Sequence, residues 1–227
     1  MPELPEVQTV VSMLRQHTVG MKIDAVKVHR RDLRWPIPSC FEKNLQGKTI
    51  SDVTRRSKYI LMWLNPGVMI VHLGMSGQIK LQSPSDGVAK HDHVAWFLGD
   101  RVMRYCDPRR FGSVLYFDAL ADDRRLDVLG PEPLSDDFHA DYLHAACCHR
   151  RVPIKQRIMD ASCVVGVGNI YANESLFLAG IDPRHACGDL KMDAYMRLVD
   201  AIRMVLNKAI AQGGTTLKDF KHLDGKA

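Results

Sequence analysis

The sequence of 227 residues lacks the features that would assign it to a membrane or to a secreted, disulfide-bonded class. No apolar run reaches the roughly 18 residues that span a bilayer. The N-terminus has neither the basic nor the apolar segment of a secretory signal peptide. The six cysteines form no CxxC pair, so we expect buried thiols in a reducing compartment. These absences predict a cytoplasmic protein.

Positive charge is in excess only in the first part of the chain. Residues 1–131 hold 19 Lys and Arg against 14 Asp and Glu, whereas residues 132–227 hold 12 of each, which gives the net charge of +5. A mild basic balance fits a polyanionic partner such as nucleic acid, although many unrelated enzymes share it. With 46% apolar residues, the chain is long enough to bury the core of one large or two modest domains.

Two periodicities divide the chain. The apolar residues Val7, Val10, Val11 and Leu14 recur at the spacing of one helix face, which predicts an N-terminal helix ending near Gly20. Short apolar runs separated by Pro and Gly turns then predict the strands of a β-sandwich or barrel. These runs are 21–29, 49–55, 59–64, 68–72, 78–81, 93–98, 102–105 and 113–117.

The strand pattern stops at Pro131 and Pro133, and helical patterns follow. The predicted helices are 136–149, 153–160, 169–179 and 190–212. We therefore expect an α+β fold, with a β-sandwich domain of residues 1–131 followed by a helical domain of residues 132–227.

The first residues carry groups suited to amine chemistry. Removal of the initiator methionine would expose the secondary amine of Pro2, and an α-amine with a pKa of roughly 7.7–8.0 is partly neutral at physiological pH. Such an amine attacks carbonyl-like carbons to form a Schiff base. Glu3 and Glu6 stand beside it and could act as general acid or base. The alternative is a capping segment, in which proline starts a helix and the acids favour its dipole.

Three further segments are candidate contacts to DNA or to a reacting group. Lys58 precedes an apolar strand, either held at the strand edge or as an ordinary solvated lysine. Met75 stands between glycines, which is poorly explained as core, although a Met tucked under the sheet is the alternative. Arg109 and Phe111 lie in the turn 105–112 and suit insertion into a base stack, where a side chain replaces an extruded base. A solvated turn is the alternative.

His91 and His93 are one residue apart at the start of a predicted strand, so we expect them to point to the same face. Two histidines so arranged could be metal ligands, but no third ligand is evident. Phosphate contact or structural hydrogen bonding is therefore favoured. A metal-dependent nuclease built on this pair is the alternative, and it predicts sensitivity to chelators.

A glycine-punctuated turn at 164–168 opens a predicted helix. Its backbone N–H groups, the helix N-terminus and the Asn169 carboxamide would together form an anion site. Lys155 and Arg157, on the preceding helix, could flank the same phosphates. The glycine pattern alone is weak, since most such turns bind nothing.

Taken together, the motifs resemble those of the bacterial formamidopyrimidine-DNA glycosylases. They are PELPEV, RRSKYIL, HLGMSG, KHDH, YCDPRRFG, LGPEPLSDDF, VVGVGNIYANE and GGTTLKDF. Each is weak alone, but their common order from residue 2 to the last residues is specific. The resemblance implies an N-terminal helix with a β-sandwich, followed by a helix–two-turn–helix domain.

The resemblance also implies an activity. The family are bifunctional base-excision repair enzymes that remove oxidised purines, namely 8-oxoguanine and formamidopyrimidines, and cleave the strand by β,δ-elimination. The implied partner is double-stranded DNA containing such lesions or abasic sites. A monomer acting at the nucleoid in the bacterial cytoplasm, without membrane contact, is expected.

Four catalytic residues are implied. Pro2 would attack C1′ of the damaged nucleotide and form the Schiff base, while Glu3 would protonate the opening sugar. Glu6 would orient Pro2 or a water. Lys58 would contact phosphate beside the lesion and support catalysis.

The implied DNA contacts fall into three groups. Met75, Arg109 and Phe111 would fill the gap left by the flipped base, with Arg109 facing the orphaned cytosine. His91 and Asn169 would contact the DNA backbone, Asn169 from the helix–two-turn–helix element. A lid over the flipped purine would consist of Lys155 and the loop residues Thr215, Thr216 and Lys218.

Two departures from the family pattern stand out. Family members normally continue past the position of Ala227 into a zinc finger with four cysteines, which supplies an arginine to the phosphates. No cysteine pair remains here for such a finger, so we expect no metal or other cofactor in this chain. One structural zinc would be expected only if the finger were present, and activity without it is expected to be weakened. Gln8 occupies a position where an acid is more usual.

Two alternatives remain beside this prediction. One is an endonuclease VIII-like glycosylase for oxidised pyrimidines, against which Leu4 and the intact set of Met75, Arg109 and Phe111 argue. The other is a truncated form that binds DNA but is catalytically impaired.

Overall fold

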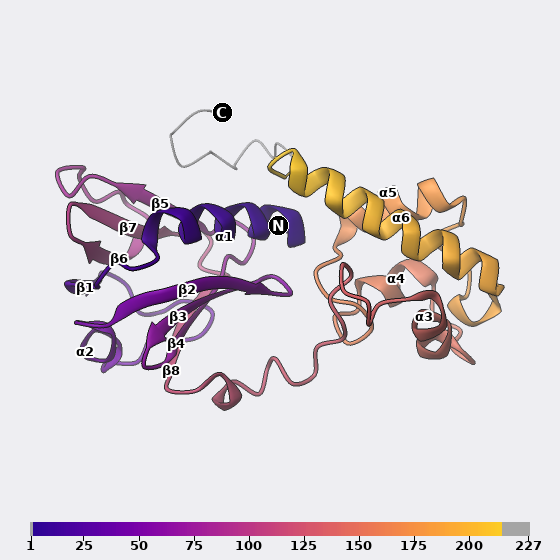
Figure 1. Ribbon diagram of the computed structural model, residues 1–227, viewed down its shortest axis with the longest axis horizontal. Coiled ribbons are helices and arrows are strands. Elements are labelled where there is room, and N and C mark those ends of the chain that lie inside the picture. The colour runs from indigo at the N-terminus through magenta and orange to yellow at the C-terminus, as the bar shows by residue number, and fades with distance from the viewer. Residues whose placement is uncertain (1, 215–227) are drawn as a thin grey trace. The chain divides into compact units, whose positions relative to one another are not determined.

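The computed structural model describes residues 2–214 (Figure 1). These residues form two compact units. We call residues 2 and 7–123 the β unit, and residues 3–6 and 124–214 the helical unit. The first turn of helix α1 (Leu4–Thr18) thus groups with the helical unit, and the remainder of the helix with the β unit.

The β unit contains two antiparallel sheets of four strands each (Figure 1). One sheet has the order β1-β6-β7-β5 and the other the order β2-β3-β4-β8. The strands are β1 (Ala25–Val28), β2 (Thr49–Arg56), β3 (Tyr59–Asn65), β4 (Val68–His72), β5 (Gln78–Gln82), β6 (Asp92–Leu98), β7 (Arg101–Cys106) and β8 (Ser113–Phe117). The predicted sandwich is confirmed, and each predicted run contains one strand. The run 21–29 is the least accurate, because only its second half pairs with β6.

The core of the β unit joins both sheets to helix α1. Val7, Val10, Val11 and Leu14 are at most 5% exposed and belong to the same apolar cluster as Trp96 and other strand residues. Each fully buried aliphatic side chain of this kind contributes about 1.5–3 kcal/mol. The predicted helix face is therefore confirmed. The short helix α2 (Phe41–Leu45) was not predicted, because only its two end residues are buried.

The helical unit consists of α3 (Ala140–Cys147), α4 (Ile154–Met159), α5 (Asn169–Ala179) and α6 (Met192–Ala211), and a 3₁₀ turn at Cys187–Asp189. Helix α6 packs against α5 and α3. Helix α5 ends at Gly180, whose φ of 68° is left-handed. The predicted helix 136–149 is shorter in the structure, because the His139 ring caps it by accepting from the Tyr142 N–H. None of the helices in residues 2–214 has the length and apolar character needed to cross a bilayer.

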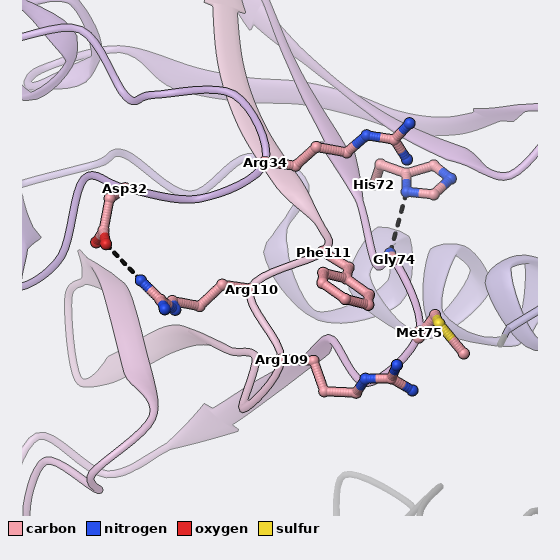
Figure 2. Close-up of a pocket in the computed structure, with 8 residues that line it drawn as sticks. All are labelled: Asp32, Arg34, His72, Gly74, Met75, Arg109, Arg110 and Phe111. Carbon is pink, nitrogen blue, oxygen red and sulfur yellow. Dashed lines mark hydrogen bonds and ion pairs between the residues drawn. The ribbon is translucent and has the colours of Figure 1, made fainter.

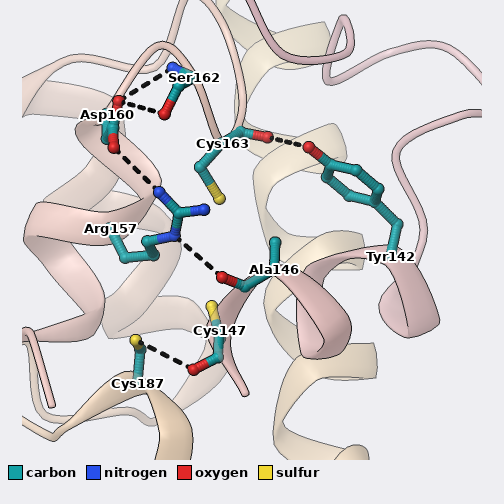
Figure 3. Close-up of polar contacts among 8 residues, drawn as sticks. All are labelled: Tyr142, Ala146, Cys147, Arg157, Asp160, Ser162, Cys163 and Cys187. Atoms are coloured by element: carbon teal, nitrogen blue, oxygen red, sulfur yellow. Dashed lines mark hydrogen bonds and ion pairs between the residues drawn. The ribbon is translucent and has the colours of Figure 1, made fainter. Parts of the chain in front are cut away.

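The six cysteines are all free thiols. Three of them, Cys147, Cys163 and Cys187, are buried in the core of the helical unit (Figure 3). Contact with Cys163 and burial raise the pKa of Cys147, and burial raises the pKa of Cys187 to about 11. The expectation of buried thiols is wrong for Cys40, which is exposed because it precedes α2 at the surface, and for Cys148, which is only partly buried.

Candidate active site and nucleic-acid interface

Glu3 caps the N-terminus of helix α5. Glu3 is 3% exposed, and its carboxylate accepts from the backbone N–H groups of Gly168 at 2.8 Å, Ile170 at 3.0 Å and Tyr171 at 3.4 Å. The first N–H groups of a helix have no partner within the helix and carry partial positive charge. A carboxylate is therefore stabilised at this position.

The glycines of the turn before α5 admit the N-terminal segment. A Cβ at Gly168 would collide with the Glu3 side chain, and one at Gly166 would come within 2.6 Å of Leu4 Cδ1. The backbone N–H of Leu4 donates to the Gly166 carbonyl at 3.1 Å. The sequence predicted an anion site here for phosphate. In the structure the bound anion is Glu3 itself, a residue too distant in sequence to be paired with the turn from spacing alone.

Glu6 holds the peptide group that joins Pro2 to Glu3. One oxygen of its carboxylate accepts from the Glu3 backbone N–H at 2.8 Å, and the other accepts from the Tyr171 hydroxyl at 2.6 Å. Glu6 is fully buried and Tyr171 is 1% exposed. Sequence reasoning missed Tyr171, whose only signal was its place directly after Asn169 and Ile170. The two acids of PELPEV are thus fixed by contacts to one helix terminus.

Lys58 lies in the two-residue turn between β2 and β3 and is half-buried. Ser57, beside it, has a left-handed φ of 57°. Arg55 steadies this turn, since its guanidinium donates to the Ser57 carbonyl at 2.9 Å and to the Gln8 side-chain oxygen at 3.0 Å. Gln8, the residue that departs from the family pattern, is therefore an acceptor for Arg55.

The candidate gap-filling residues converge in the β unit. Met75 and Phe111 are 43% and 45% exposed, although both are large and apolar. The Arg109 guanidinium carbon lies 4.7 Å from the Phe111 ring centroid, a cation–π contact. All three line a pocket of about 640 Å³, drawn in Figure 2. The other lining residues are Asp32, Arg34, His72, Gly74 and Arg110.

Sequence reasoning missed Asp32, Arg34 and His72 as lining residues. They lie far from Arg109 along the chain, although they line the same pocket. Asp32 pairs with the Arg110 guanidinium, and also with Arg30 at 2.6 Å. Its hydrogen bond with Arg30 lowers the pKa of Asp32. Asp32 thus ties the 30–34 segment to Arg110 at the edge of the pocket (Figure 2). Isolated polar residues of this kind carry no periodic signal in the sequence.

The premise that placed His91 and His93 on one strand face, regular alternation along a single strand, is wrong. Strand β6 begins at Asp92, so His91 lies outside it, and the pairing with β7 shifts register between Asp92 and Val94. Because this bulge breaks the alternation of side chains, spacing does not put the two rings on one face. His93 is buried and its Nε2 is hydrogen-bonded to the Asp107 carbonyl at 2.7 Å. His91 is half-buried and is not among the residues that line the pocket.

Of the basic residues predicted on α4, only Lys155 is partly exposed. Arg157 is 8% exposed and is held inside the unit, where it donates to the Ala146 carbonyl at 3.2 Å and to Asp160 at 2.9 Å (Figure 3). The prediction that Arg157 flanks phosphates is therefore wrong. Asn169 is exposed as the first residue of α5.

The predictions for the lid residues of the C-terminal loop and for the initiator methionine are not tested by the structure. Thr215, Thr216, Lys218 and Met1 lie outside the described residues. Within residues 2–214, no three His, Cys, Asp or Glu side chains come together in an arrangement that could hold a metal ion. The absence of a cofactor stays a prediction.

Two family models cover most of the chain. The model of the formamidopyrimidine-DNA glycosylase N-terminal domain matches residues 1–114, and that of the H2TH domain of the same family matches residues 129–221. The chain belongs to the formamidopyrimidine-DNA glycosylase family. The predicted resemblance is confirmed, and with it the expected combination of a β-sandwich and a helix–two-turn–helix domain.

Individual relatives agree with this assignment. The formamidopyrimidine-DNA glycosylase of Thioalkalivibrio sulfidiphilus is 49% identical over 99% of this chain and 84% of its own length. That of Photobacterium profundum is 50% identical over 100% of this chain and 84% of its own length. A mutant Lactococcus lactis FPG, solved in complex with DNA containing Fapy-dG, has a TM-score of 0.90 and 31% identity, covering 100% of this chain and 84% of that one.

Proposed function

We propose that this chain is a base-excision repair glycosylase that removes 8-oxoguanine and formamidopyrimidines from double-stranded DNA, and then cleaves the strand at the abasic site. Family membership supports the reaction class, and the related Lactococcus lactis enzyme is solved with DNA that contains Fapy-dG. We further propose that it acts as a monomer on nucleoid DNA in the bacterial cytoplasm.

The observation that carries the catalytic part is the fixed position of the residue next to Pro2. The backbone N–H of Glu3, which belongs to the Pro2–Glu3 peptide, donates to Glu6 at 2.8 Å, and the Glu3 carboxylate is bonded to the α5 terminus. Both ends of Glu3 are therefore immobilised. A nucleophile attached to such a residue loses little orientational freedom when it reacts, which favours attack on C1′.

The proposed chemistry uses an amine and a carboxylate that are neighbours in the chain. Without Met1, Pro2 carries an ammonium group whose pKa in model peptides is roughly 7.7–8.0. A proton passing from this ammonium to Glu3 would free the amine for attack and provide the proton that opens the sugar ring. The C1′–N bond to the base breaks as the Pro2–C1′ bond forms. Ring opening leaves an iminium (Schiff base) between Pro2 and C1′, which acidifies the C–H bond at C2′. Loss of a C2′ proton would break the C3′–O bond and release the 3′ phosphate (β-elimination), and loss of the C4′ proton would then break the C5′–O bond and release the 5′ phosphate (δ-elimination).

DNA contacts are proposed for both units. Met75, Arg109 and Phe111 would occupy the space left by the flipped base, which partly offsets the few kcal/mol that unstacking costs. Lys58, His91 and Asn169 would contact phosphates. Lys155, together with residues 215, 216 and 218, would cover the flipped purine.

Borohydride trapping tests the proposal. We expect a covalent complex between protein whose Met1 has been removed, verified by intact mass, and a duplex containing 8-oxoguanine opposite cytosine. The matched control is the same protein with a retained N-terminal extension, which blocks the Pro2 amine and should give no complex. Absence of a complex at high concentration of the processed protein would mean that this chain binds DNA without catalysis.

One further substrate and one reagent address the alternatives. Preferential trapping on a thymine-glycol duplex would favour an endonuclease VIII-like enzyme. Incision that EDTA abolishes would favour the metal-dependent nuclease, whereas the proposed reaction proceeds on the chain's own amine.

A further inference from the structure

Two loops of the β unit meet at one buried carboxylate. The first, residues 73–77, joins β4 to β5 and carries Met75; the second, residues 107–112, joins β7 to β8 and carries Arg109 and Phe111. Asp107, at the start of the second loop, is 0% exposed. The gap-filling side chains therefore belong to two loops with a common anchor.

Each oxygen of Asp107 accepts from two donors. Oδ1 accepts from the Ser76 hydroxyl at 2.6 Å and from the Arg109 backbone N–H at 3.3 Å. Oδ2 accepts from the Gly112 backbone N–H at 2.9 Å and from the Tyr105 hydroxyl at 3.2 Å. Hydrogen bonds to a buried carboxylate are roughly twice as strong as neutral ones. Asp107 therefore fixes both ends of its own loop.

Ser76 links the two loops. Its hydroxyl oxygen also accepts from the Arg109 backbone N–H at 3.2 Å while the hydroxyl donates to Asp107. Ser76 follows Met75 directly. The residue after Met75 is thus bonded to the backbone of Arg109 and to the carboxylate that holds Arg109.

The loop backbones also touch. A Cβ at Gly74, where φ is 62°, would come within 2.5 Å of the Phe111 carbonyl carbon and of the Gly112 nitrogen. Asp107 is also anchored by β6 and by the residue before it, since its carbonyl is hydrogen-bonded to His93 and its N–H donates to the His91 carbonyl at 3.1 Å. The contacts leave little room for one loop to move without the other.

We propose that Asp107 and Ser76 are positioning residues that hold Met75, Arg109 and Phe111 as one preformed unit, and thereby determine how strongly the enzyme discriminates the base opposite the lesion. The inference rests on the proposed function, in which Arg109 faces that base. The Arg109 side chain can distinguish one opposite base from another only if it is held in a narrow range of positions. Loosening Asp107 or Ser76 should therefore reduce discrimination between opposite bases before it reduces the rate of excision.

Three variants test this inference. Ser76→Ala cuts the link between the loops and leaves the other bonds to Asp107 in place. Asp107→Asn puts an NH₂ group against a backbone N–H, whichever way the amide turns, because Arg109 and Gly112 donate to opposite oxygens. Tyr105→Phe is the matched control, since it removes a hydroxyl bonded to Asp107 and, at 3.4 Å, to the His72 carbonyl, but leaves the bonds of Ser76 to Asp107 and Arg109 in place.

The measured quantity is the ratio of single-turnover incision of 8-oxoguanine opposite cytosine to that opposite adenine. Misfolded protein lowers both rates and cancels in this ratio. We expect Ser76→Ala to lower it about 3- to 10-fold and Asp107→Asn about 10-fold or more, with Tyr105→Phe within about twofold of the parent protein. Incision of a single-stranded abasic oligonucleotide, which has no opposite base, should change less than about twofold for Ser76→Ala.

Equal ratios for Ser76→Ala and the parent protein would overturn the inference, as would an equal drop in Tyr105→Phe. If Asp107→Asn does not fold, Ser76→Ala decides the question alone. If the parent protein incises no substrate, the proposed function fails. The inference is then tested by binding. The affinity of the protein is measured for two duplexes that contain tetrahydrofuran, one with cytosine and one with adenine opposite it. Ser76→Ala should lower the ratio of these two affinities by the same factor as is expected for incision.

Discussion

Glu3 in the helical unit and Asp107 in the β unit are both buried carboxylates that accept backbone N–H groups from a glycine-containing turn. They differ in how far along the chain their donors lie. Glu3 bonds to donors 165–168 residues away, whereas the backbone donors of Asp107 lie two and five residues away. The backbone bonds of Glu3 require the completed tertiary fold, whereas those of Asp107 close a local turn, and its bond from the Ser76 hydroxyl is added by the fold.

The sequence distance between each carboxylate and its backbone donors matches a different structural role. A local acceptor such as Asp107 shapes its own loop at small entropic cost, because the closed loop is short. Glu3 instead ties the chain's first turn to a helix terminus far along the sequence, and so its carboxylate links folding to the position of the candidate nucleophile. In the proposed function, Asp107 shapes a DNA-contacting surface, while Glu3 positions the Pro2 amine.

The largest expected effect is that of Glu3→Gln. A glutamine keeps the shape but cannot carry the proton, so excision of 8-oxoguanine should fall roughly 10²- to 10⁴-fold in single-turnover assays. Asp141→Asn, at a side chain 84% exposed in α3, is the control and should leave the rate unchanged. If Glu3→Gln excised at the parent rate, Glu3 would have no role in proton transfer, and the proposed difference between Glu3 and Asp107 would fail.

Gly112→Ala tests how rigid the Asp107 side of the comparison is. A Cβ there would collide with the Tyr105 hydroxyl and the His72 carbonyl, and the carbonyl cannot move without the strand. We expect a loss of about 2–4 kcal/mol in the free energy of unfolding, measured with urea. Gly87→Ala is the control, because nothing lies within 4 Å of its Cβ. A loss below that of the control would contradict the close approach.

Gly168→Ala tests the Glu3 side in the same way, with a different expected outcome. The three atoms nearest its Cβ would all belong to the end of the Glu3 side chain, which can turn away. The cost in stability should be about 1 kcal/mol, the value of a lost helix cap, while excision falls about tenfold or more. The opposite pattern, with large instability and normal excision, would argue against a catalytic role for the position of Glu3.

The smallest effect, a change in thermal stability, is expected at Asp160, whose side chain is 48% exposed. The Ser162 backbone N–H, with help from Arg157, lowers the pKa of Asp160 in the folded state. Because the pKa of Asp160 is lower in the folded than in the unfolded state, its ionised carboxylate stabilises the fold at pH values above the unfolded pKa of about 3.9. This stabilisation is lost as the pH falls below that value and through the folded pKa. Asp160→Asn should therefore lower Tm by a few degrees at pH 7, and the difference should shrink below about pH 4. A difference independent of pH would exclude the charge as its cause.

Local pattern was sufficient for most of the secondary structure. Short apolar runs separated by turns such as Asn65-Pro66-Gly67 indicated the eight strands of the β unit, and the spacing of Val7 to Leu14 indicated a helix face that is buried. Pattern failed at α2, which is only five residues long, and at His91, where a bulge breaks the alternation. It also failed at Arg157, because a lone cation carries no mark of being buried.

By itself, the sequence determined the order of elements, the family, and the residue types at the candidate site, because periodicity and motif order are properties of neighbouring residues. Only the tertiary structure decided that Glu3, rather than a phosphate, bonds to the α5 terminus. It also decided that Ser76 and Asp107 join the loops of Met75 and Arg109. The physical reason is that a backbone N–H can donate to any acceptor and a carboxylate can accept from any donor, so the fold decides which partner comes within about 3 Å.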